Sequence, residues 1–240
     1  MLYEAASLIY LTNSITGEQQ VIKAENMLSK LFAVFGVTGL LAPGLAMLTV
    51  FFVWHVTSKE RWTIRPWVLA GMVIEAAVWA IPLLVLGALV NKVVATFAVS
   101  YDSPVVDTVR PLLAAAAKAD PAGGVWQARA AISIGAGLYE ELVFRLAGIA
   151  LVHFVTRDLL RFPQWLAATI AVVGTSAAFA FYHDVYTGRS GLEAIAWSPL
   201  AFYFLAGLSF AGLYLWRGFG IVVLTHAVYD LIVLVGLKAL

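Results

Sequence analysis

The chain has 240 residues, of which 62% are hydrophobic and only 12% are charged. An ordinary soluble domain has about 45–50% apolar and about 25% charged residues, so this composition excludes a soluble globule. It also excludes a disordered chain, which needs low hydrophobicity and high charge. The net charge of +1 does not indicate a nucleic-acid partner. The absence of cysteine excludes disulfides, thiolate metal sites and a cysteine nucleophile. We therefore expect a multi-pass integral membrane protein whose partner is the lipid bilayer.

The predicted elements begin with an amphipathic leader, residues 1–30, which we expect to lie on the membrane surface. A spanning helix needs about 20 consecutive apolar residues. Six such segments follow: 31–56, 66–90, 130–155, 165–182, 199–215 and 219–237. The first contains Pro43 and Gly44, which predict a kink. The long polar connection 91–129 contains a second possible surface helix, 105–119.

These segments predict an all-α fold, a polytopic transmembrane helix bundle of about six spanning helices. We divide the chain into two parts. Residues 1–129 hold the leader, two spanning helices and the long loop, and residues 130–240 hold a four-helix core.

Ionisable residues inside the predicted spans are the main functional signal, because a charge at the bilayer centre costs at least ~2.5 kcal/mol. Such residues persist where they pair, line a wet cavity or act chemically. Apart from Glu75, they all follow residue 129 and lie on three separate helices. They are Glu140, Glu141, Arg145, His226 and Asp230, with His183 at a membrane edge.

The spacing of these residues assigns them to helix faces. Glu141 and Arg145 are four residues apart, so they share a face and can form an ion pair. Glu140 is rotated by about 100° from Glu141 and points elsewhere, so it can face a cavity while its neighbour is neutralised. Two further pairs have the same spacing: Phe179 with His183, and His226 with Asp230.

A buried glutamate and two histidines can hydrolyse an amide without a cysteine. The glutamate can take a proton from water as a general base, and the histidines can hold that water or stabilise the oxyanion. Each feature also has a purely structural interpretation. Glu141 and Arg145 can form a structural ion pair, and each histidine can hydrogen-bond to a neighbouring helix.

Two other chemistries compete with this interpretation. Glu140, His183 and His226 form a His₂Glu set of the kind that zinc accepts, but the motif H-E-x-x-H is absent. The stretch 174–177, Gly-Thr-Ser-Ala, loosely resembles the rhomboid motif G-x-S-G, with Ala177 in place of the last glycine. Its small residues are better explained by close helix packing. We therefore predict neither a metal nor another cofactor.

Three motifs occur in order on successive predicted helices: E-E-x-x-x-R at 140–145, F-x-x-x-H at 179–183 and H-x-x-x-D at 226–230. In this arrangement the sequence resembles the CAAX prenyl endopeptidase and bacteriocin-processing family (CPBP, also called the abortive-infection family), which includes the Ras-converting prenyl protease. The resemblance covers about residues 130–238, including the helix at 204–218.

The resemblance implies a metal-independent, glutamate-dependent membrane endopeptidase that acts on a peptide or lipidated protein in a bacterial cell membrane. The family also contains members for which proteolysis is not needed. The alternative is therefore a non-proteolytic scaffold or immunity protein that binds a partner in the same pocket. The implied roles are water activation by Glu140 with His183, an oxyanion pocket from His226 and Asp230, and support from Glu141, Arg145 and Phe179.

The aspartate of the third motif raises a chemical question, because an ionised carboxylate offers no donor to an oxyanion. Either Asp230 is protonated, or its charge keeps His226 protonated as the donor. We prefer the second hypothesis.

Overall fold

In a computed structural model, the described residues are 2–11, 22–39, 41–59, 63, 65–96, 125–183, 185–186 and 195–236. They are helical apart from short connections and an isolated antiparallel bridge between Tyr186 and Ile195. The predicted all-α class is therefore confirmed. Within these ranges, four helices are long and apolar enough to cross a membrane: Pro66–Val90, Gln164–Tyr182, Trp197–Arg217 and Phe219–Gly236. The predicted surface helix 105–119 lies outside the described residues.

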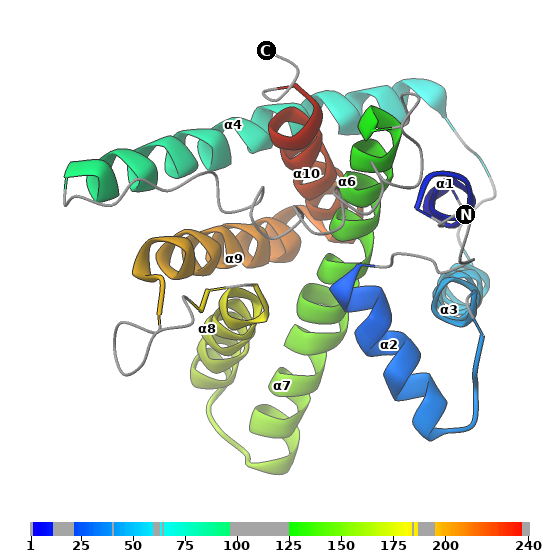
Figure 1. Cartoon of the computed structure of the whole chain (residues 1–240). Coiled ribbons are helices and arrows are strands. Elements are labelled where there is room, and N and C mark those ends of the chain that lie inside the picture. The colour runs from blue at the N-terminus through cyan, green and yellow to red at the C-terminus, as the bar shows by residue number, and fades with distance from the viewer. Residues whose placement is uncertain are drawn as a thin grey trace.

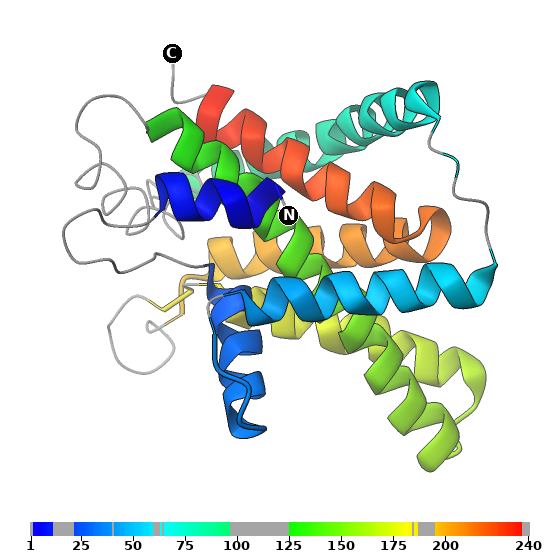
Figure 2. The same ribbon diagram turned by 90° about the vertical axis from the view of Figure 1, so that its right-hand side faces the viewer.

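The predicted first span, 31–56, is wrong as a single helix. Helix α2 (Lys23–Val34) ends within it, and α3 (Ala42–Ser58) begins anew. Gly36 has a φ of +76°, a backbone conformation that other residues rarely adopt. Pro43 lies in the first turn of α3, where its missing N–H breaks no helical hydrogen bond. The proline therefore starts a helix instead of kinking one, and α2 runs steeply across α3 (Figure 2).

The leader is packed into the bundle. Helix α1 (Leu2–Tyr10) contacts α6 (Val125–Glu141), and α2 contacts the same helix near its own start. Tyr3 is fully buried, and so are Glu4 and Glu25. The prediction of a leader lying on the membrane surface therefore misses the contact of α1 with the core.

Helix α4 (Pro66–Thr96) contains Pro82 and packs on α9 (Trp197–Arg217) and α10 (Phe219–Leu231). Glu75 of α4 and Arg217 at the end of α9 form a two-pronged ion pair, with N–O distances of 2.5 and 2.8 Å. This pair explains the intramembrane Glu75 as a link between two helices.

Helix α6 continues without a break as far as Leu159, but its hydrogen bonding changes. The turns widen to i→i+5 bonds in η1 (Leu142–Ile149) and again in η2 (Val155–Leu159), with α7 (Ala150–Phe154) between them. Such widened turns often occur at functional sites. Helix α8 (Gln164–Tyr182) then packs on α7 and α9. Helix α10, followed by η4 (Ile232–Gly236), lies between α4 and α6 (Figure 1).

Helices α6 and α10 approach very closely at Gly137. A Cβ atom at this position would lie 2.8 Å from both the Ala227 nitrogen and the Val223 oxygen of α10. Only glycine allows this contact, because the opposing atoms are backbone and cannot rotate away. The contact sets the distance between the glutamates that end α6 and His226 on α10.

Candidate active site

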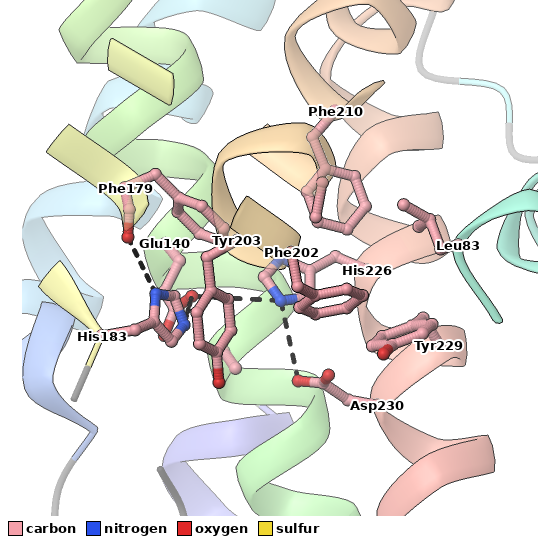
Figure 3. Close-up of a pocket in the computed structure, with 12 residues that line it drawn as sticks. Leu83, Glu140, Phe179, His183, Phe202, Tyr203, Phe210, His226, Tyr229 and Asp230 are labelled. Atoms are coloured by element: carbon pink, nitrogen blue, oxygen red, sulfur yellow. Dashed lines mark hydrogen bonds and ion pairs between the residues drawn. The ribbon is translucent and has the colours of Figure 1, made fainter. Parts of the chain in front are cut away.

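A small cavity with both polar and apolar walls lies where α6, α8, α9 and α10 meet (Figure 3). Its volume is about 30 Å³, which is enough for one or two water molecules. Leu83 of α4 also lines the cavity, so a residue from the part of the chain before residue 130 contributes to the lining. The polar lining residues are Glu140, His183, Tyr203, His226, Tyr229 and Asp230, and the apolar ones include Ala136, Phe179, Phe202, Ala206 and Phe210.

Glu140 lies at the centre of this group. Its Oε2 atom is 3.7 Å from His183 Nε2 and 3.9 Å from His226 Nε2. The side chain is buried, and Oε2 accepts no hydrogen bond from the described residues. Tyr182 hydrogen-bonds to the same carboxyl group. Polar contacts longer than 3.5 Å are typical of groups that a water can bridge, so all three atoms are within reach of one water molecule.

His183 is held in one tautomer. Its Nδ1 donates to the Phe179 carbonyl oxygen at 2.8 Å, so Nε2 faces Glu140 as an acceptor when the ring is neutral. His183 lies one residue beyond α8, and its burial lowers the pKa of the ring, which favours the neutral form. A neutral His183 can accept a hydrogen bond from a water and so orient it.

His226 lies among three carboxylates. Its Nδ1 is 2.7 Å from Glu141 Oε1. Its Nε2 is 3.6 Å from Asp230 Oδ2 and 3.9 Å from Glu140 Oε2. An imidazolium carries N–H groups on both nitrogens, so this surrounding suits the charged form, with Nε2 as a donor toward the cavity.

Glu141 and Arg145 form the predicted ion pair, with Oε2 and Nε 3.1 Å apart and both side chains almost completely buried. Arg145 is also 3.3 Å from the Gly207 carbonyl oxygen, and its guanidinium lies 4.2 Å from the centre of the Phe179 ring. Glu141 therefore bridges Arg145 and His226. Arg145 in turn contacts α9 at the Gly207 carbonyl oxygen.

All seven predicted site residues come together. Glu140, His183, His226 and Asp230 line the cavity with Phe179, and Glu141 and Arg145 lie behind it. The sequence did not predict the contact of Glu141 with His226 or the hydrogen bond of Tyr182 to Glu140. It also did not predict that two aromatic residues of α9 stack on the histidines. Tyr203 and Phe210 are seven residues apart on that helix, a spacing that could have indicated them. Buried aromatic residues at helical spacing are, however, common in any core.

The competing chemistries can be compared with the same geometry. Within the described ranges, no group of three or more histidine, aspartate and glutamate side chains is arranged to hold a metal ion. Ser176 is buried and donates its hydroxyl to the Val172 carbonyl oxygen at 2.7 Å. The serine therefore takes part in the hydrogen bonding of its own helix.

A second polar cluster lies on the other side of α6. The Tyr3 hydroxyl donates to Glu25 Oε2 at 2.5 Å, and the Tyr139 hydroxyl donates to Glu4 Oε1. The rings of Tyr3 and Tyr139 meet edge to face. Burial raises the pKa of Glu25 to about 7. Because Tyr139 precedes Glu140, this cluster anchors α6 beside Glu140 to the leader.

Comparison with known proteins gives one match. Residues 123–232 match the family model described as Type II CAAX prenyl endopeptidase Rce1-like. No curated protein and no solved structure matches the chain. The matched region contains all three motifs, and the family is one of proteases that act on peptide or protein substrates. With its four membrane-capable helices, the chain is an integral membrane protein. Residues 123–232 are therefore similar to the Rce1-like CAAX prenyl endopeptidase family, as the resemblance predicted.

Proposed function

We propose that this protein is a glutamate-dependent intramembrane endopeptidase that hydrolyses a peptide bond near the bilayer surface, in a peptide or lipidated protein. One observation carries the proposal: Glu140 Oε2 lies within 4 Å of both His183 Nε2 and His226 Nε2 at a water-sized cavity. We also propose that residues 130–240 are the catalytic core, which α4 completes through Leu83.

In the proposed reaction, a water donates one hydrogen bond to Glu140 and the other to neutral His183. Its lone pair then points away from both and toward the substrate carbonyl carbon. Glu140 takes a proton as the oxygen attacks, which converts the carboxylate to the acid and forms a tetrahedral oxyanion. The dry surroundings strengthen these interactions, because few waters compete for the same groups.

The oxyanion then accepts a hydrogen bond from His226 Nε2. We propose that Asp230 and Glu141 keep His226 charged for this purpose, since carboxylates lie near both of its nitrogens. Collapse of the intermediate breaks the C–N bond, and the leaving amine takes the proton from Glu140. Glu140 returns to a carboxylate, so no other proton donor is needed.

The test is cleavage of a prenylated CAAX-type peptide by the full chain in detergent micelles. Glu140→Gln keeps the shape of the side chain and removes the base, so kcat should fall by about 10²- to 10⁴-fold. Glu25→Gln is the matched control, because Glu25 is also buried but lies outside the cavity. Cleavage by the Glu140→Gln variant at the wild-type rate would refute the role of Glu140 as the base, and a wild type that cleaves no such peptide would favour a non-proteolytic role.

A chelator distinguishes the glutamate mechanism from a zinc mechanism. Wild-type activity should persist after dialysis against a strong chelator. Loss of activity that added Zn²⁺ restores would show that Glu140, His183 and His226 act as metal ligands instead.

A further inference from the structure

Helix α9 contributes three aromatic rings to the cavity. Besides Phe202, these are Tyr203 and Phe210, for which the proposed reaction gives no role. They lie seven residues apart, close to two helical turns, and so share one face of α9. Both are buried. Figure 3 shows Tyr203 beside His183 and Phe210 beside His226. Since α9 packs between α8 and α10, it reaches a histidine from each of these two helices.

Each ring stacks on one histidine. The Tyr203 and His183 rings are 3.7 Å apart between centroids, at 16° between planes. The Phe210 and His226 rings are 4.6 Å apart, at 19°. By contrast, Phe179 meets both histidines edge-on, at 65° and 76°. A stacked, near-parallel aromatic ring restricts the plane of an imidazole. The stack covers only the face of the imidazole ring.

The ring edges remain available for hydrogen bonds. Nδ1 of His183 donates to the Phe179 carbonyl, and Nδ1 of His226 lies 2.7 Å from Glu141. One such bond still allows the ring to swing about the line that joins donor and acceptor. The stacked aromatic ring blocks this swing, so the bond and the stack together define where Nε2 points.

We propose that Tyr203 and Phe210 are positioning residues that hold the His183 and His226 rings at the angle at which both Nε2 atoms face Glu140. The catalytic consequence rests on the proposed function, but the placement of the rings does not. Tyr203 serves the water-orienting histidine and Phe210 serves the oxyanion-binding one. The two aromatic residues therefore have separable effects.

The test begins with histidine NMR, because the chain has only four histidines. A proton above an aromatic face is shifted upfield by the ring current. In the full chain with labelled histidine, Tyr203→Leu should remove the upfield shift of the His183 signals and leave those of His226. Phe210→Leu should do the reverse. Tyr203→Phe keeps the ring and should restore the His183 signals. Phe204→Leu, on the same helix, is the control that should affect neither histidine.

Peptide hydrolysis then measures the catalytic consequence. Each leucine variant should lower kcat by up to about 100-fold with little change in KM, because small misplacements of catalytic groups cost this much. Tyr203→Phe should recover the rate. Unchanged histidine signals in the leucine variants would overturn the proposal, and so would altered signals with unchanged kcat. If the wild type hydrolyses no peptide but the selective NMR changes appear, the placement stands and the proposed function fails.

Discussion

Replacing Glu141 by glutamine should destabilise the protein by about 3–5 kcal/mol, the typical cost of breaking a buried ion pair. Glu141 lies 3.1 Å from Arg145 Nε and 2.7 Å from His226 Nδ1, and all three side chains are buried. Without the carboxylate charge, Arg145 keeps the Gly207 carbonyl oxygen and the face of Phe179, neither of which carries a charge. Native proteins have a free energy of unfolding of only about 5–15 kcal/mol, so this loss is a large fraction of it.

The measurement is the free energy of unfolding from denaturant titration of the full chain in micelles. A double variant, Glu141→Gln with Arg145→Met, removes the stranded charge and should recover part of the lost stability. Glu25→Gln is the control, because the new amide oxygen can still accept from Tyr3, so this variant should not be less stable than wild type. The reasoning is refuted if Glu141→Gln lies within about 1 kcal/mol of wild type, or if the double variant is less stable than the single one.

Three further predictions follow from particular contacts. Asp230→Asn should lower kcat by about 10- to 100-fold, because His226 loses a carboxylate 3.6 Å from Nε2; wild-type kcat would mean that a neutral donor suffices. The pKa of Glu25 is raised by burial from 4.5 to about 7, so its contribution to stability is complete below pH 4.5 and is lost as pH rises through 7, on the order of 3 kcal/mol. The free energy of unfolding of the wild type should be lower at pH 8 than at pH 5, and the Glu25→Gln variant should show a smaller difference. If wild type and variant lose the same stability between the two pH values, the raised pKa of Glu25 is contradicted. Gly137→Ala should cost about 1–3 kcal/mol and reduce kcat, because its Cβ would meet the α10 backbone at 2.8 Å. Gly174→Ala is the matched control, since its Cβ would have no neighbour within 4 Å among the described residues.

The pairs of site residues that lie on one helix could be predicted from local spacing. Four-residue separations place side chains on one helix face, and the ion pair of Glu141 with Arg145 and the contact of His226 with Asp230 follow this rule. The rotation between consecutive residues likewise separates Glu140, which lines the cavity, from Glu141 behind it. A charged side chain is costly inside the hydrocarbon of the bilayer, so the ionisable residues of the spans were expected to pair with one another or to line a cavity.

Contacts between helices could not be predicted, because spacing within one helix says nothing about its neighbours. The contact of Glu141 with His226 depends on the close approach of α6 and α10. The stacking of Tyr203 on His183 depends on where α9 lies between its neighbours.

The first predicted span failed for a different reason. Hydropathy counts apolar residues without regard to backbone geometry. A continuous apolar run therefore concealed the end of α2 at Val34 and the start of α3 at Ala42. The composition of the leader likewise gave no sign that Tyr3 packs against α6.

The central claim is that Glu140 and His183 act on one and the same water molecule. The most direct test is a double-mutant cycle on kcat/KM, with Glu140→Gln, His183→Gln and the double variant, in the same peptide assay. Groups that act as a unit have strongly non-additive effects. The account predicts that the double variant is nearly as active as the slower single variant. If the two losses multiply, the residues act independently, and the shared water is contradicted.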